Sequence, residues 1–341
     1  MDDQRVEFGV RLPIQGPLSG PGAIVQVARR AEQLGFDAVW VSDFIDWNRN
    51  QDRFHLSSGS AEIIGPEQVP VYYESLTTLS FLAGLTQRVR LGIAVLCLPY
   101  RNPLVTARQL TNIDVYSGGR LIVGIGPGGS KSGHNRNFEV LGVPRARKFE
   151  RMVDYFRAIR CLWTEPVSEY QGEFISFPPV EFYPKPVQKP HPPVWGGGWT
   201  QTSLEVVAQF CDGWIPGWVT PEEYPEYIER LYDMARARGR DGVRFTIATE
   251  IFAIVDRTHE GAYEKSKATF AALPLGFQTN PPEEKIRRSS LVGSVEEVRE
   301  QVRRFVDAGV RHFELKFIYH SIEHLLEQME LFGREIIPMF R

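Results

Sequence analysis

The sequence predicts an α/β protein of the TIM-barrel class, a (β/α)8 barrel with insertions. Short runs rich in β-branched residues alternate along the chain with amphipathic helical stretches, which favours parallel strands joined by right-handed crossovers. The alternation repeats eight times, which favours a closed barrel over an open doubly wound sheet. No break in composition divides the 341 residues, and barrels of this length are common as single units, so we expect one domain over residues 1–341.

The first half of the chain supplies four of these strands. Gly35 stands where a helix C-cap glycine belongs, which ends the first helix there. The run DAVWV that follows is apolar enough to be buried on both faces, as in a parallel sheet. The expected strands are residues 6–12, 37–41, 89–98 and 120–125, and the expected helices are 22–34, 75–85, 103–116 and 145–163.

The second half continues the alternation but contains insertions. Ser294 and Glu297 have the spacing of a capping box, and the helix that they open stops at Gly309. A strand beginning at Val194 is followed by strands over 213–219, 244–255 and 311–318. Insertions are expected at 165–193 and 261–288, and a long polar loop, of the kind that is usually functional, at 46–70.

Composition excludes several classes of partner. A net charge of -3 gives no reason to expect nucleic acid or an anionic membrane. No apolar run approaches the 18 residues of a membrane span, and the N-terminus lacks the pattern of a signal peptide. Cys97, Cys161 and Cys211 are isolated from one another and form no metal or disulfide pattern. We therefore expect a cytoplasmic protein without a nucleic-acid or membrane partner.

The active site of such a barrel lies at the carboxyl ends of the strands. There, Gly196, Gly197 and Gly198 let the backbone approach a ligand, and the helix after Thr200 offers unpaired N–H groups and a positive dipole end to a phosphate. The alternative is that the glycines only form a tight turn and that the hydroxyls only cap the helix. A single glycine-rich loop leaves both interpretations open.

A second glycine-rich segment, GIGPGG at 124–129, formally matches the dinucleotide fingerprint G-x-G-x-x-G. Residues 130–137 are polar and typical of a loop, and no acidic residue ends a strand about 20 positions later, so a dinucleotide fold is disfavoured. We expect Gly126, Gly128 and Gly129 to let a flat ring lie against the strand end.

Two further patterns occur near predicted strand ends. His320, Glu323 and His324 match the zinc motif H-x-x-E-H, but no other Cys/His cluster supplies a third ligand, and a pair of histidines on a helix face is the favoured interpretation. Four tryptophans crowd two strand ends, which favours an aromatic pocket over ordinary core. They are Trp195, Trp199, Trp214 and Trp218.

Several segments together resemble the luciferase-like monooxygenase superfamily, most closely its deazaflavin-dependent branch. They include LGFDAVWVSD, LGIAVLCLPYRNP, SGGRLIVGIGPGG, PPVWGGG with CDGW, and LVGSVEEVREQVRRFVDAGVRHFEL. The resemblance implies a β/α barrel, often dimeric, that binds the deazaflavin coenzyme F420 or FMN. It also implies a bulge under the ring at Ala94, Val95 and Leu96, where relatives often have a non-proline cis peptide.

The resemblance further assigns roles at the strand ends. Gly196, Gly197, Gly198 and Thr200 correspond to the phosphate loop, and Asp43, Gly126, Gly128 and Gly129 border the ring or the coenzyme tail. Relatives commonly carry a proton-donating histidine where this chain has Phe44. Candidate replacements for that acid are Asp43, His134, His320 and Tyr100. The substrate side is expected at Phe44, Trp47, Trp199 and Trp218.

The function expected from this combination is hydride transfer between reduced deazaflavin and a small enone, imine, carbonyl or alcohol, in a homodimer. An FMN-dependent two-component monooxygenase of the same fold is the alternative. A metal-dependent hydrolase using His320, Glu323 and His324 is less favoured, and a protein that binds the coenzyme without catalysis is a further alternative. The loop at 46–70 is expected to close over the substrate.

Overall fold

The eight predicted strands close into a parallel barrel in the computed structural model, which describes residues 5–45, 71–129, 132–276 and 283–341. The hydrogen-bonded order is β1-β2-β3-β4-β7-β8-β9-β11, and β11 pairs again with β1. The barrel strands are β1 (Glu7–Arg11), β2 (Ala38–Val41), β3 (Arg90–Cys97), β4 (Leu121–Gly126), β7 (Val194–Gly197), β8 (Gly213–Ile215), β9 (Thr246–Asp256) and β11 (His312–Phe317). The TIM-barrel prediction is therefore confirmed.

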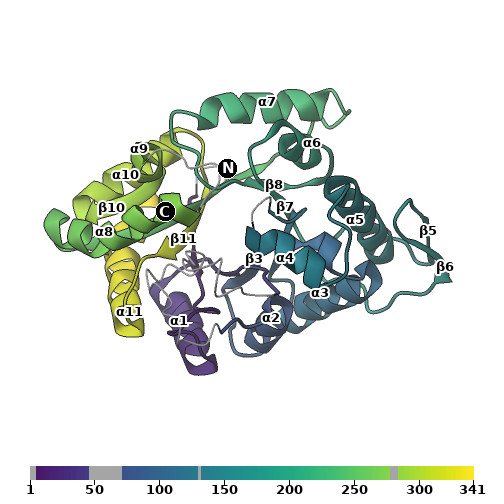
Figure 1. The fold of residues 1–341 in the computed structure, drawn as a ribbon, viewed down its shortest axis with the longest axis horizontal. Coiled ribbons are helices and arrows are strands. Elements are labelled where there is room, and N and C mark those ends of the chain that lie inside the picture. Colours follow the sequence, from purple (N-terminus) through teal and green to yellow (C-terminus); the bar gives the residue numbers. More distant parts are fainter. Residues whose placement is uncertain (1–4, 46–70, 130–131, 277–282) are drawn as a thin grey trace.

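Helices surround the strands and bury their apolar faces against them (Figure 1). None of the described helices is long and apolar enough to cross a membrane. The helices are α1 (Pro21–Leu34), α2 (Ser75–Ala83), α3 (Pro103–Ser117), α4 (Ser132–Val140), α5 (Lys148–Thr164), α6 (Gln201–Phe210), α7 (Tyr224–Arg236), α8 (His259–Gly276), α9 (Glu283–Arg288), α10 (Val295–Asp307) and α11 (Ile322–Leu331), with short η turns at Leu98–Tyr100, Phe332–Ile336 and Ile337–Phe340.

The predicted helix boundaries hold where a capping residue defines them. Gly35 takes the left-handed conformation, with φ 82°, at the end of α1. Ser294 and Glu297 form both hydrogen bonds of a capping box at the start of α10. The sixth strand is shorter than predicted: it ends at Ile215, because Pro216 has no N–H to continue the ladder.

The structure adds elements that the sequence pattern did not predict. Residues 165–193 contain an antiparallel hairpin, β5 (Ser168–Gln171) with β6 (Ser176–Val180), at the outer edge of the molecule beside α5 (Figure 1). Directly after the predicted insertion at 261–288 comes β10 (Ser290–Ser294), which pairs in parallel with the end of β9.

One prediction was wrong in detail. The polar residues after the GIGPGG segment were expected to form a loop, yet Ser132–Val140 is helical. A dinucleotide fold is still excluded, because β4 is a strand of a closed barrel, whereas dinucleotide folds are open sheets.

Candidate active site

The barrel interior consists of two layers of inward-facing side chains. The lower layer, here called the floor layer, contains Trp40 and Trp195, whose ring centroids lie 5.3 Å apart. Glycines on neighbouring strands leave room for these indoles. A Cβ on Gly92 would collide with Trp40, and one on Gly213 would collide with Trp195. Trp195 is 1% exposed, so it belongs to the barrel core and not to an aromatic pocket.

The polar groups of the floor layer satisfy one another. Trp40 donates its indole N–H to His312 Nε2 at 3.2 Å, and His312 Nδ1 lies 2.9 Å from a Glu7 carboxylate oxygen. The hydrogen bond from His312 lowers the pKa of Glu7 to about 2, against the opposing effect of burial. The floor of the barrel is therefore closed and internally paired.

The upper layer, here called the mouth layer, is ionic and consists of Arg11, Glu250, Glu314 and Lys316. Arg11 lies between the two carboxylates: it pairs with Glu314 and, at 3.1 Å, with Glu250. Lys316 pairs with the other oxygen of Glu250. The Glu250 side chain is 26% exposed, whereas Glu314 is fully buried. Only Glu250 among the two acids therefore reaches the open end of the barrel.

The predicted bulge lies directly beside the mouth layer. The ladder between β3 and β4 shifts register between Ile93 and Leu96, and the Ala94–Val95 peptide bond is cis, as the resemblance implies. Arg11 donates a hydrogen bond to the Ala94 carbonyl at 3.3 Å. The guanidinium thus joins the bulge on β3 to the acids on β9 and β11.

Glycines on β4 and β7 receive the side chain of the bulge. A Cβ on Gly126 would lie 2.5 Å from a Val95 methyl group, and one on Gly197 would lie 3.2 Å from the other. Glycine at these two positions therefore leaves room for the Val95 side chain. Val95 itself is half-buried at the strand end, next to which the coenzyme ring is predicted to lie.

The second glycine-rich loop combines strand packing with helix capping. Gly196 packs against α6, where a Cβ would approach a Val207 methyl group to 2.5 Å. Gly198 has φ +83°, and the Thr200 hydroxyl caps α6 by accepting from the Ser203 N–H at 3.3 Å. The Thr200 hydroxyl therefore does cap the helix. This leaves the phosphate site as a prediction, because a single cap satisfies one of the four N–H groups at a helix start.

The Gly128–Gly129 turn is held by a cation that the sequence did not single out. Lys148, at the start of α5, donates to both carbonyls, at 2.5 Å from Gly128 and 3.0 Å from Gly129. Gly128 has φ +82°, and a Cβ there would lie 2.8 Å from the Cys97 sulfur and 3.2 Å from the Tyr100 hydroxyl. Desolvation lowers the pKa of Lys148 and raises the pKa of Cys97, so neither is a simple surface group.

Asp43, a predicted acid, is surrounded by donors. It accepts from the Cys97 N–H at 3.0 Å and the Ser75 hydroxyl at 3.0 Å, and it pairs with the Arg101 guanidinium. Its side chain is 1% exposed. This geometry supports a role in joining β2, β3 and α2 rather than in proton transfer to a ligand.

The remaining predicted residues are dispersed. Phe44 is half-buried against Tyr72, with ring centroids 5.9 Å apart, and Trp218 packs on Phe252 at 5.4 Å. Trp199 is 38% exposed. Trp214 is buried in the α7 interface and donates to the Gly198 carbonyl at 2.7 Å, so like Trp195 it is core. Trp47 and the side chain of His134 lie outside the described residues.

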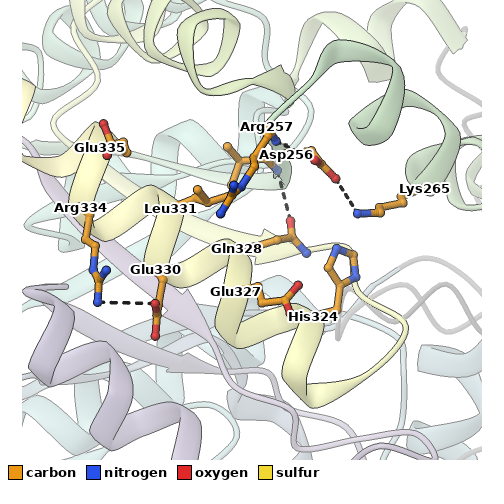
Figure 2. Close-up of a pocket in the computed structure, with 11 residues that line it drawn as sticks. Asp256, Arg257, Lys265, His324, Glu327, Gln328, Glu330, Leu331, Arg334 and Glu335 are labelled. Carbon is orange, nitrogen blue, oxygen red and sulfur yellow. Dashed lines mark hydrogen bonds and ion pairs between the residues drawn. The ribbon is translucent and has the colours of Figure 1, made fainter.

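The H-x-x-E-H motif lies elsewhere, at the start of α11. The rings of His320 and His324 are in contact at a tilt of 36°, with centroids 4.2 Å apart, and His324 lines a cavity of about 420 Å³. Figure 2 shows His324 and Gln328 facing the Asp256–Lys265 ion pair across this cavity. Within the described ranges, no three His, Cys, Asp or Glu side chains are grouped to hold a metal ion. The structure therefore gives the hydrolase alternative no support.

The residues that sequence reasoning missed are the charged members of buried strands. Arg11, Glu250, Glu314 and Lys316 were included in the predicted strands only as strand residues. Glu314 and Lys316 stand two positions apart in HFELKF, so both face the same side of β11. Charges at alternate positions of a buried strand are the signal that could have identified the mouth layer, since such groups are rarely buried without partners.

Comparison with known proteins agrees with this architecture. The sequence model of the luciferase-like monooxygenase family matches residues 6–312. The chain is 26% identical over 352 residues to the F420-dependent glucose-6-phosphate dehydrogenase of Amycolatopsis mediterranei, covering 94% of this chain and 95% of that protein. It is 25% identical over 340 residues to the FMNH2-dependent dimethylsulfone monooxygenase of Pseudomonas putida, covering 87% and 88%.

A solved structure shows the same fold over nearly the whole chain. It is a monooxygenase from Streptomyces bottropensis, with a TM-score of 0.79 and 23% identity, covering 98% of this chain and all of that one. With the family match extending over most of the described barrel, the chain belongs to the luciferase-like monooxygenase family.

Proposed function

We propose that this protein transfers a hydride between a reduced deazaflavin, coenzyme F420, and a small enone, imine, carbonyl or alcohol. Membership of the family makes the chain an oxidoreductase of the flavin- or deazaflavin-dependent class. The observation that carries the proposal is the bulge at Ala94 and Val95, which brings a half-buried apolar side chain to the open end of the barrel beside an ionic cluster.

The described residues fit such a coenzyme. Val95 offers an apolar surface for a flat ring, and the start of α6 after Gly198 offers N–H groups and a positive dipole end to a phosphate. Lys148 orders the turn at Gly128 and Gly129, which would border the coenzyme. The bound coenzyme would supply the hydride, while the protein would bind, orient and exclude water.

An FMN-dependent monooxygenase is the second candidate, and it is supported by the similarity to the dimethylsulfone monooxygenase. Both coenzymes carry a tricyclic ring and a phosphate, so the same bulge and helix start would hold either. The deazaflavin reading is favoured by the match to the glucose-6-phosphate dehydrogenase, which extends over slightly more of both chains.

Binding of the two coenzymes to the purified protein tests the proposal. We expect deazaflavin to bind at least about tenfold more tightly than FMN, a difference of about 1.4 kcal/mol, measured by absorption and fluorescence titration. Tight binding of neither would overturn the proposal, and preferential binding of FMN with oxygen-dependent turnover would establish the alternative.

A matched pair of glycine variants tests the phosphate site. Gly198→Ala disturbs a left-handed turn at the start of α6, whereas Gly242→Ala adds a methyl group with nothing within 4 Å. We expect the first to weaken coenzyme binding by about tenfold or more and the second to leave it unchanged. Equal binding by both variants would remove the phosphate role of this loop.

We also propose that the protein is a cytoplasmic homodimer, with the chain folded as one domain. Neighbouring helices α2 and α3 carry large apolar side chains that are exposed, with Phe81 at 49%, Val105 at 57% and Tyr116 at 62%. Light scattering of the purified protein tests the dimer, and a monomer at micromolar concentration would contradict it. Substitution of Phe81 by Lys is expected to weaken the dimer if this surface forms the interface.

A further inference from the structure

Two carboxylates share one cation at the mouth of the barrel. Glu250 on β9 and Glu314 on β11 both pair with Arg11 on β1. Their surroundings differ: Glu250 is partly exposed at the open end of the barrel and Glu314 is fully buried beneath it. One carboxyl can therefore meet a ligand while the other cannot.

Arg11 fixes the exposed carboxylate beside the predicted seat of the ring. The same guanidinium nitrogen, Nη2, lies 3.1 Å from a Glu250 oxygen and donates to the Ala94 carbonyl at 3.3 Å. A single nitrogen atom of Arg11 therefore contacts both the Glu250 carboxylate and the Ala94 carbonyl of the bulge. The other candidate acids in the described structure are placed differently. Asp43 is enclosed by donors, Tyr100 is buried edge-on against Phe138, and His320 is exposed beside His324.

The buried carboxyl is incompletely satisfied. One Glu314 oxygen, Oε2, has no hydrogen-bond partner among the described residues. An ionised oxygen left without a donor in a buried site is costly, so the site favours a proton on this carboxyl. Burial raises the pKa of Glu314, and the negative charge of the adjacent Glu250 raises it further. Glu250 shows the opposite shift: burial opposes its ionisation, but the cations Lys316 and Arg11 hold its pKa below the usual value.

We propose that Glu250 is the acid–base residue of the site and that Glu314 is the buried carboxyl with which it shares a proton, both held by Arg11. This proposal deepens the proposed function and rests on it. The charged groups that face Glu250 are Arg11 from β1 and Glu314 and Lys316 from β11, with Tyr72 near Arg11. The pair would fill the role left open by Phe44.

The chemistry balances for reduction of a carbonyl. Bound reduced deazaflavin would supply the hydride: it would lose a C–H bond and be oxidised by two electrons, while the substrate carbon would gain a C–H bond and the electron pair of the C=O π bond would move to oxygen. The carboxyl pair holds one proton, which rests on Glu314. Glu250 takes this proton from Glu314 and gives it to the substrate oxygen, so that the C=O group becomes C–OH and both carboxyls end as carboxylates. For oxidation of an alcohol, Glu250 accepts the hydroxyl proton instead. Paired carboxyls in different environments commonly act in this way, because one environment favours the protonated form and the other the ionised form.

The shared proton can be tested without coenzyme or turnover. Infrared difference spectra of the cofactor-free protein, titrated with pH, report the C=O stretch of a protonated carboxyl. We expect one such band at neutral pH that is absent in Glu314→Gln and shifted in Glu250→Gln. Glu181→Gln, which removes an exposed carboxyl, serves as the matched control and should leave the band unchanged. Absence of the band from the wild-type protein at neutral pH would overturn the shared proton.

Kinetics then separate the acid–base role from binding. Glu250→Gln is expected to bind deazaflavin within about threefold of wild type yet lose about 100-fold or more in kcat, because general acid–base catalysis contributes roughly 10²–10⁴-fold. Glu250→Asp should recover part of the rate, with an altered pH profile. A Glu250→Gln enzyme that keeps kcat within threefold of wild type would overturn the assignment.

The two failures are distinguishable. If wild type neither binds deazaflavin nor turns over, the proposed function fails, while the infrared band still reports on the carboxyl pair. If wild type turns over and Glu250→Gln does so equally, only the acid–base role fails. Should Glu250→Gln not fold, the spectrum of the wild-type protein and the pH profile of Glu314→Gln decide the proposal in its place, because a shared proton predicts a shifted kcat profile in that variant.

Discussion

The two layers inside the barrel differ in how completely their polar groups are paired. In the floor layer, the Trp40 indole, His312 and Glu7 form a chain of hydrogen bonds beside the neighbouring indole of Trp195. In the mouth layer, four charges meet beside the bulge, and one carboxyl oxygen has no partner among the described residues.

This difference indicates that the floor layer serves stability and the mouth layer serves function, although the same strands carry both. The floor layer fills the barrel with large apolar rings, which is typical of the stabilising end of the fold. The mouth layer keeps ionisable groups where packing alone would favour apolar ones, and incompletely satisfied polar groups are typical of sites that act on a ligand. Four variants test this contrast, in order of decreasing effect.

The largest effect is expected from Trp40→Ala in the floor layer. The substitution leaves a cavity in a fully buried site and removes the partner of His312 Nε2. We expect a loss of about 3–5 kcal/mol in the free energy of unfolding, measured by urea denaturation. Trp199→Ala, at a 38% exposed position, is the control and should cost less than about 1 kcal/mol. Similar losses for both would show that the floor layer is not the stabilising core.

Gly92→Ala is expected to cost about 1–3 kcal/mol, because the added methyl group would overlap the Trp40 ring. The same substitution made in the Trp40→Ala background should cost much less, since the clashing ring is gone. A double-mutant cycle measures this coupling. Additive effects would mean that Gly92 is required for a reason other than the indole.

Glu7→Gln should lower stability by about 1–2 kcal/mol at neutral pH, allowing for partial exposure of the side chain. The folded pKa of Glu7 is lowered to about 2 from about 4.5, so its contribution is present above pH 4.5 and is lost as the pH falls toward 2. The stability curves of variant and wild type should therefore converge in acid. Curves that stay parallel down to the lowest pH at which the protein folds would contradict the lowered pKa.

Glu314→Gln should show the opposite pH slope, with the smallest change, about 1 kcal/mol between pH 5 and pH 8. Burial raises the folded pKa of Glu314 above its unfolded value, so the folded state holds the extra proton and wild type loses stability as the pH rises through that window. The variant does not lose stability in this way, so its free energy of unfolding relative to that of wild type should rise with pH. An unchanged difference across the window would show that Glu314 is ionised throughout.

The sequence by itself determined the barrel and its family. The alternation of strands and helices placed all eight barrel strands, and local signals such as Gly35 and the Ser294–Glu297 box fixed helix ends, because these features depend on neighbours in the chain. The resemblance also located the bulge at Ala94 and Val95. Trp195 and Trp214 were assigned to a pocket wrongly, because a sequence position near a strand end does not say which side of the strand a ring faces.

Only the tertiary structure decided which groups meet inside the barrel. Arg11, Glu250 and Glu314 lie on three strands, and the first is separated from the last by 303 positions in the chain. Their contact depends on barrel closure between β11 and β1 and on the register of β9 against β11. No local pattern encodes that register. The alternating charges of HFELKF mark Glu314 and Lys316, but only the folded chain shows that they meet Arg11 and Glu250.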